Sequence, residues 1–171
     1  RGASGGAVPR ERNSRMTENA EPNGNIERQL AEQGFYVSTT VGCSMRPMLR
    51  NRRDRVIVLP LGDERLKKYD LPLYRRPDGK YILHRIIGVR DGEYVIRGDN
   101  TYAKEYVPDA WVLGYVSEFY RGKRHVLSTA RSYRFYARVW NLIYPVRRVF
   151  HAGRTFAARV WHKLNPKKHS V

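Results

Sequence analysis

Residues 81–97 read YILHRIIGVRDGEYVIR, two runs rich in isoleucine, valine and tyrosine that are joined by Arg-Asp-Gly-Glu. β-Branched and aromatic residues favour strands, and an Asp-Gly pair between two such runs favours a tight hairpin turn. A second Asp-Gly pair lies in Pro77–Lys80, directly before the first run. The stretch therefore predicts consecutive antiparallel strands at Tyr81–Val89 and Glu93–Arg97.

Strand signals continue on both sides of this stretch. The other runs with the same composition are Phe35–Val41, Arg55–Leu59, Leu71–Tyr74 and Trp111–Tyr120. A short helical pattern at Ile26–Gln33 is followed by Gly34, which predicts a helix that ends at a glycine cap. We therefore expect a mainly β fold, a compact and mostly antiparallel β domain with several hairpins.

The hydrophobic period changes after His125. Apolar and aromatic residues then recur at helical spacing, first at Tyr133, Tyr136, Ala137, Trp140, Ile143 and Tyr144. Pro145 stands where the first turn of a second helix is expected. The opposite face of that helix is basic, with Arg147, Arg148, His151, Arg154, Arg159 and Lys163. The sequence therefore predicts two basic amphipathic helices in the C-terminal segment.

Charge is distributed unevenly along the 171 residues. The chain has 33 Lys and Arg against 16 Asp and Glu, a net charge of +17, yet 13 of these basic residues and no acidic residue follow position 120. Residues 1–25 are polar and are predicted to be disordered. We therefore divide the chain into a disordered segment (1–25), a β domain (26–125) and a basic helical tail (126–171).

The basic tail predicts an anionic partner, either a membrane surface or nucleic acid. Aromatic residues on the apolar helix faces, Trp140, Phe150 and Trp161, favour insertion at a lipid headgroup boundary. No run reaches the roughly 18 apolar residues of a membrane span, and residues 1–30 lack the apolar region of a signal peptide. We expect a peripheral, membrane-associated protein at the cytoplasmic face, with nucleic acid as the alternative partner.

Ser44 is the candidate nucleophile. It lies in GCSMRPML, residues 42–49, and is followed about forty residues later by His84 and then by Gly-Asp-Asn at 98–100. A hydroxyl, an imidazole and a carboxylate are the groups that activate a serine nucleophile. We predict that Ser44 attacks, that His84 is the general base and that Asp99 orients His84. Cys43 is an alternative nucleophile, and Asp99 alternatively closes a turn.

These residues resemble the conserved boxes of the signal peptidase I and LexA-like group of serine peptidases. The stretch Ser44-Met-x-Pro-x-Leu49 resembles the family's nucleophile box. Further boxes follow in the family's order at Asp54–Val58, Tyr69–Tyr74, Tyr81–Gly88, Ile96–Asn100 and Val112–Val116. The resemblance spans about residues 38–120. It implies a LexA-like or signal-peptidase-like β domain and a serine endopeptidase that cleaves precursor or leader peptides.

His84 stands where most bacterial members have lysine, which is similar to the endoplasmic-reticulum type of signal peptidase. In that type the resemblance implies that Asp99 is the third catalytic residue. An ordinary imidazole is largely neutral at pH 7, whereas a lysine must have its pKa lowered to act as a base. Gly42 stands where the family often has a hydroxyl that helps to bind the oxyanion, which leaves the Ser44 N–H as the candidate donor.

The expected substrate is an extended peptide that is added as a strand beside the active site. The resemblance implies small residues before the scissile bond. A LexA-like self-cleaving or DNA-associated regulator and an inactive scaffold are the alternatives. We predict no cofactor and no metal site. Cys43 is the only cysteine in the sequence, which excludes an internal disulfide and argues against a cysteine-based metal site.

Overall fold

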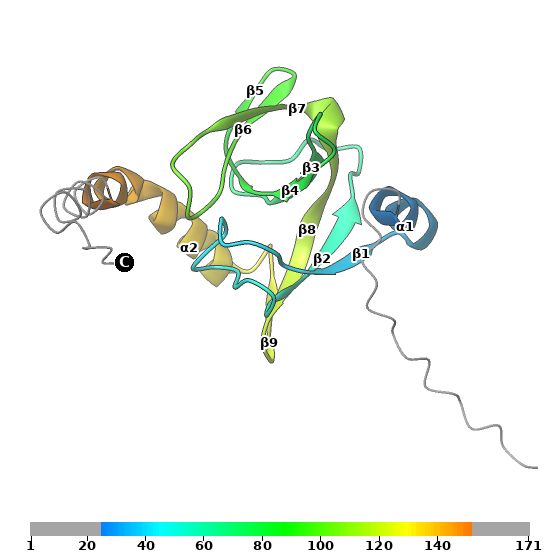
Figure 1. The fold of residues 1–171 in the computed structure, drawn as a ribbon, viewed down its shortest axis with the longest axis horizontal. Helices are drawn as coiled ribbons and strands as arrows, with labels where there is room; N and C mark the ends of the chain where they lie inside the picture. Colours follow the sequence, from blue (N-terminus) through cyan, green and yellow to red (C-terminus); the bar gives the residue numbers. More distant parts are fainter. Residues whose placement is uncertain (1–24, 152–171) are drawn as a thin grey trace, which may run out of the picture.

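The computed structural model describes residues 25–151. Two antiparallel sheets form the body of the protein, with one helix before them and further helices after them (Figure 1). The predicted mainly β fold is confirmed at this level. The predicted disorder of residues 1–25 lies outside the described residues except at Asn25, which is the first residue of the N-terminal helix. The predicted lipid contact of Trp161 also lies outside them.

The larger sheet forms a half-barrel. Its strands, in spatial order, are β1 (Tyr36–Thr39), β2 (Arg55–Pro60), β8 (Val112–Arg121), β3 (Pro72–Arg75) and β4 (Tyr81–Leu83), and β9 (Arg124–Leu127) also pairs with β8. All pairs are antiparallel. Because β1 and β4 end the strand order, each has one edge that pairs with no other strand of residues 25–151.

The smaller sheet contains β5 (Arg85–Arg90), β6 (Glu93–Arg97) and β7 (Glu105–Pro108). The single strand predicted over residues 81–89 is wrong, because the chain changes sheets at His84. Leu83 pairs with β3 in the larger sheet, whereas Arg85 pairs with β6 in the smaller one. His84 therefore lies at the junction of the two sheets. Strands β7 and β9 were not predicted.

The expected glycine turns are confirmed. Gly79 (φ +80°) closes the β3–β4 hairpin, and Gly92 (φ +70°) closes the β5–β6 hairpin. Gly34 (φ +73°) ends α1 (Asn25–Gln33), and its N–H donates to the Leu30 carbonyl at 3.2 Å. Glycine occupies positive φ without the steric cost that a Cβ imposes, so these positions are determined locally.

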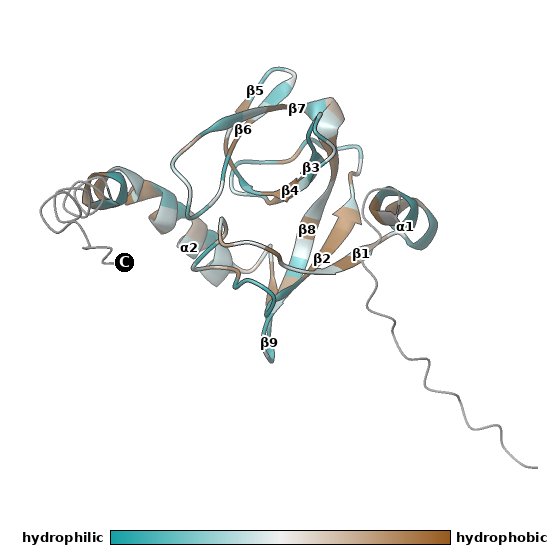
Figure 2. Ribbon diagram, viewed as in Figure 1, coloured by the Kyte–Doolittle hydropathy of each residue, from teal (hydrophilic) through white to brown (hydrophobic). Residues whose placement is uncertain are grey.

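The core is divided into two clusters that meet at the half-barrel. One is formed by the larger sheet and by α1, and it receives Met45, Met48 and Leu49 from the segment that follows β1. The other lies between the smaller sheet and β3 and β8. Figure 2 shows the apolar ribbon of β2, whose Val56 and Val58 belong to the first cluster. The apolar residues of the Ser44 motif therefore anchor their own loop in the core.

The C-terminal segment begins as two helices. Helix α2 spans Arg131–Leu142, and a further helix starts at 144 and is described to 151, with Pro145 in its first turn as predicted. A short 3₁₀ helix, η1 (Asp109–Trp111), precedes β8. Tyr133 and Ala137 of α2 are buried against the β domain, on the side of the protein away from α1 (Figure 1). Among residues 25–151, no helix is both long and apolar enough to span a membrane.

Candidate active site

Ser44 is carried by a loop, residues 40–54, that is closed at its base by backbone hydrogen bonds. The Thr40 N–H donates to the Asp54 carbonyl at 2.9 Å, and the Arg52 N–H donates to the Thr40 carbonyl at 2.7 Å. The side chain of Asp54 is fully buried, and its Oδ2 accepts a hydrogen bond from the Arg50 N–H at 2.8 Å. The closed base and the core methionines hold the loop that presents Ser44.

A second segment, Gly98–Asn100, holds this loop from the other side. The Asn100 N–H donates to the Ser44 carbonyl at 2.7 Å. The Asn100 side-chain amide donates to the Cys43 carbonyl at 3.2 Å. The Gly-Asp-Asn motif therefore contacts the candidate nucleophile through its asparagine, as well as forming the turn that its composition predicts.

Gly98 lies where three parts of the site approach one another. A Cβ added to Gly98 would be 2.8 Å from the Ser44 carbonyl oxygen and 3.1 Å from Cδ2 of His84. Ser44 and His84 also line one cavity of about 280 Å³. The structure thus brings together the predicted nucleophile and the predicted base around a position where only glycine fits.

Replacing Gly98 by alanine is expected to displace the Ser44 loop or the His84 ring, and a reaction that uses both side chains should lose about 100-fold in kcat/KM, because displacing reacting groups by roughly 1 Å costs about that much. The added methyl group must push either the Ser44 backbone or the His84 ring. Gly88→Ala is the matched control, since its Cβ would lie 3.5 Å from Val95 at ordinary contact distance. Equal activity of the two folded variants, verified by thermal unfolding, would contradict this account of Gly98.

His84 is buried, with 7% of its surface exposed, and its Nδ1 lies 3.2 Å from Oε1 of Glu105. A carboxylate can only accept hydrogen bonds, so we assign the imidazole proton to Nδ1. The other ring nitrogen, Nε2, is then the unprotonated acceptor. It is bonded to Cδ2, the ring atom that faces Gly98. This tautomer suits a general base that takes a proton from the Ser44 side of the cavity.

Glu105 is the first residue of β7 and is half-buried. Its Oε2 accepts hydrogen bonds from the Tyr74 hydroxyl at 2.8 Å and from Nε of Arg76 at 3.0 Å. Burial by itself raises the pKa of Glu105, but the hydrogen bonds from Arg76 and Tyr74 outweigh it and hold the pKa below its usual value. Glu105 is therefore ionised at neutral pH, as an orienting carboxylate must be.

The pKa of His84 is lowered from its ordinary value of 6.5. Burial is the main cause, because it penalises the charged imidazolium. The negative charge of Glu105 opposes the shift, and the positive charge of Arg76 adds to it. His84 is consequently mostly neutral at pH 7.

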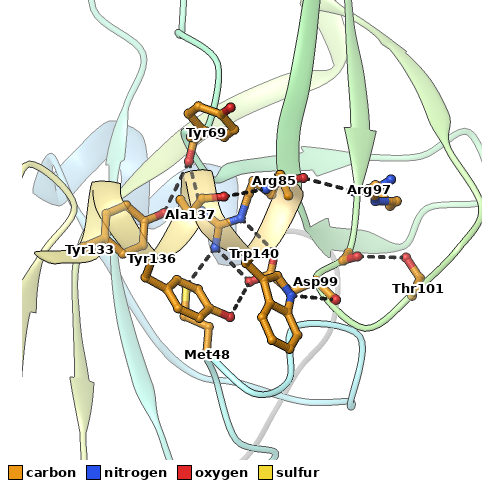
Figure 3. Close-up of polar contacts among 12 residues, drawn as sticks. Met48, Tyr69, Arg85, Arg97, Asp99, Thr101, Tyr133, Tyr136, Ala137 and Trp140 are labelled. Carbon is orange, nitrogen blue, oxygen red and sulfur yellow. Dashed lines mark hydrogen bonds and ion pairs between the residues drawn. The ribbon is translucent and has the colours of Figure 1, made fainter. Parts of the chain in front are cut away.

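Asp99 does not make the predicted contact with His84. Its two carboxylate oxygens bind Arg85, with Oδ1 at 2.7 Å from Nε and Oδ2 at 2.8 Å from Nη2 (Figure 3). The Arg85 side chain is fully buried and needs this counter-charge. The carboxylate that binds the His84 imidazole is therefore Glu105, and the prediction that Asp99 orients His84 is wrong.

The C-terminal helices also bind Asp99. Nε1 of Trp140 donates to the Asp99 carbonyl at 3.0 Å, and the Tyr136 hydroxyl lies 3.3 Å from Oδ2 (Figure 3). Nη2 of Arg147 donates to the same carbonyl at 2.7 Å. The predicted lipid contact of Trp140 is therefore wrong, because this side chain faces the protein. Arg147, predicted on a solvent-facing polar face, also contacts the β domain.

Gly42 occupies the position where the resemblance implies a hydroxyl that helps to bind the oxyanion. Its φ of +99° favours glycine, and its N–H already donates to Oδ1 of Asn51 at 2.9 Å. The nearby Thr40 hydroxyl donates to the Arg50 carbonyl at 2.9 Å. Neither group is directed at Ser44 in this state, so the Ser44 N–H stays the candidate oxyanion donor. The Cys43 side chain is exposed beside it.

The cavity beside Ser44 lies between the two edge strands of the half-barrel. Tyr36, Ser38 and Thr39 of β1 line one side, and the whole of β4 lines the other. Its apolar lining includes Ile26, Met45, Leu49, Val56, Val58 and Leu73. An apolar pocket flanked by unpaired strand edges is suited to an extended peptide with an apolar side chain.

Comparisons with models of protein families and with curated proteins find no match to this chain. Within residues 25–151, no group of three His, Cys, Asp or Glu side chains is placed to hold a metal ion. The residue that sequence reasoning missed is Glu105. Its only signal is an acidic residue shortly after Gly-Asp-Asn, and strand β7, which positions it, was not predicted.

Proposed function

We propose that the protein is a serine endopeptidase similar to the His-type signal peptidases, with Ser44 as nucleophile, His84 as general base and Glu105 as the orienting carboxylate. The observation that carries the proposal is the placement of Ser44 and His84 on one cavity, with Nδ1 of His84 bound to Glu105. The ordered sequence boxes and the mostly antiparallel sheets support a LexA-like β domain.

The proposed reaction begins when Oγ of Ser44 attacks the scissile carbonyl carbon and its proton moves to Nε2 of His84. The tetrahedral intermediate accepts a hydrogen bond from the Ser44 N–H. Collapse of the intermediate breaks the C–N bond, and His84 gives its proton to the leaving amine. Water then attacks the acyl-enzyme with His84 again as base, which releases the acid and restores the Ser44 hydroxyl.

The proposed substrate is an extended segment of a precursor or leader peptide. It would pair with the free edges of β1 and β4, so that alternate side chains enter the apolar cavity. The cavity volume of about 280 Å³ suits small apolar residues before the scissile bond. A pool of such peptides, analysed by mass spectrometry after incubation with the protein, tests the function directly. Absence of any cleavage would contradict it.

The pH profile of cleavage tests the His84–Glu105 pair. Activity requires neutral His84, so kcat/KM should fall on acidification with a midpoint below 6.5, the ordinary imidazole value. Glu105→Gln removes the charge that raises the His84 pKa, so its acid limb should move to still lower pH. Its maximal kcat/KM should drop by about two to four orders of magnitude, because the imidazole loses its orienting carboxylate.

Glu93→Gln is the matched control for this experiment. Glu93 also pairs with an arginine, Arg90, at 3.3 Å, but on the smaller sheet away from the Ser44 cavity. Its pH profile should coincide with that of the parent protein. A Glu105→Gln variant with an unchanged acid limb would show that another group sets the His84 pKa.

We also propose a peripheral location on a membrane for this enzyme. The support is the charge pattern, since the 13 basic residues after position 120 are accompanied by no acidic residue. Anionic lipid attracts such segments, by about 1 kcal/mol for each Lys or Arg near the surface.

A further inference from the structure

Helix α2 and the helix that follows it carry a second apolar face. Its exposed members are Phe135, Val139, Leu142, Val146 and Val149, which recur every three or four residues, and the adjacent Phe150. We call them the apolar strip. Leu142 and Phe150 are 78% and 71% exposed. In α2 the strip differs from the predicted apolar face, whose residues Tyr133, Ala137 and Trp140 contact the β domain. In the second helix Val146, Val149 and Phe150 belong to the apolar face that the sequence predicts.

A basic cleft adjoins the apolar strip. It has a volume of about 670 Å³, and Phe135, Val139 and Leu142 form part of its wall. Four cationic side chains also line it: Lys68, Arg97, Lys104 and Arg138. No acidic residue lines the cleft. The same surface therefore combines exposed apolar side chains with clustered positive charge.

We propose that the apolar strip and the basic cleft together dock on an anionic phospholipid bilayer. The strip would enter the headgroup boundary, and the exposed cations of the cleft, Lys68, Lys104 and Arg138, would bind lipid phosphate. Arg97 is buried and donates to Oδ1 of Asn141 instead. The inference rests on the peripheral location proposed above, but it depends on no step of the peptidase reaction. Charge complementarity favours an anionic bilayer as the binding partner. The helices that carry the strip also carry Arg131, Arg134, Arg138 and Arg148 and no acidic side chain.

A bilayer fits these features better than duplex DNA. Phosphates of DNA would match the cations, but a DNA backbone offers no apolar environment for side chains such as Leu142 and Phe150. Burial of apolar surface contributes roughly 25 cal/mol per Å², so exposed strip residues gain only where an apolar phase receives them. The bilayer interface supplies both the phosphate and the apolar phase.

Docking by this surface would also determine where the active site lies relative to the membrane. The opposite side of the same helices binds Asp99 through Trp140 and Arg147, next to the Asn100 that holds Ser44. The docked helices and the Ser44 loop are thus connected through Asp99 and Asn100.

Vesicle co-sedimentation of the full chain tests the proposal. Vesicles of phosphatidylcholine and phosphatidylglycerol in equal parts should bind the protein at least about tenfold more tightly than phosphatidylcholine alone. Leu142→Glu and Val146→Glu should each weaken binding about tenfold, and so should the pair Lys68→Gln with Lys104→Gln. Val89→Glu, at an exposed valine on β5, is the matched control and should bind like the parent.

Three outcomes would overturn the proposal. Leu142→Glu and Val146→Glu could bind as the parent does, the lipid charge could have no effect, or duplex DNA could bind tightly while vesicles do not. Thermal unfolding verifies that each exposed-site variant folds. Cleavage of a short soluble peptide should be unchanged in all of them, so a failure of peptidase activity in the parent is separable from a failure of membrane binding.

Discussion

Ser44→Ala and His84→Ala are each expected to reduce kcat/KM for peptide cleavage by about three to six orders of magnitude. The reason is that the proposed reaction loses either its nucleophile or its only proton acceptor, and residues of such a unit act together. The double variant should therefore be no slower than the slower single variant. Product formation from a short peptide, followed by mass spectrometry at pH 7, measures both effects.

Cys43→Ala is the control, because Cys43 is the neighbouring nucleophilic side chain and is exposed. It should retain most of the parent activity. Loss of activity in Cys43→Ala together with full activity in Ser44→Ala would assign the reaction to the thiol. Full activity in His84→Ala would remove the general base from the proposed mechanism.

Arg85→Met is expected to lower the free energy of unfolding by about 3 to 5 kcal/mol, the usual cost of leaving one buried charge without its partner. Arg85 is fully buried, and its guanidinium binds both oxygens of Asp99, the Tyr133 hydroxyl at 2.8 Å and the Tyr69 carbonyl at 3.1 Å (Figure 3). Substitution would strand the Asp99 carboxylate in the core. Urea denaturation, followed by circular dichroism, measures the loss.

Two further variants make this second experiment specific. Arg90→Met breaks an exposed ion pair with Glu93 and should change stability very little. Adding Asp99→Leu to Arg85→Met removes the stranded charge and should recover part of the lost stability. A double variant that is less stable than Arg85→Met alone would contradict the account of Asp99 as the counter-charge of Arg85.

Local sequence signals predicted the strands and the turns well. The Asp-Gly pairs at 78–79 and 91–92 close hairpins as expected, since glycine at positive φ and flanking β-branched residues act over a few positions. The helix that ends at Gly34 was predicted for the same reason. The break at His84 was not predicted, because nothing in YILHRIIG shows that its two halves pair with different sheets.

The residues of the candidate site were also predicted only in part. Ser44 and His84 were predicted from short motifs, and the fold brings them to one cavity. The carboxylate partner of His84 was predicted wrongly, because pairing in a buried site depends on which charges the fold brings together. Arg85 takes Asp99, and β7 carries Glu105 to the imidazole. These two outcomes depend on the tertiary structure.

The sequence by itself determined the mainly β architecture, the positions of the turns, the Ser44 and His84 motifs and the basic C-terminal segment, because each depends on neighbouring residues or on composition. Only the tertiary structure decided that Glu105 replaces Asp99 beside His84 and that Trp140 faces the protein. The physical reason is common to both. Buried charges and apolar faces take the partners that the fold places within contact distance, and those partners lie far away along the chain.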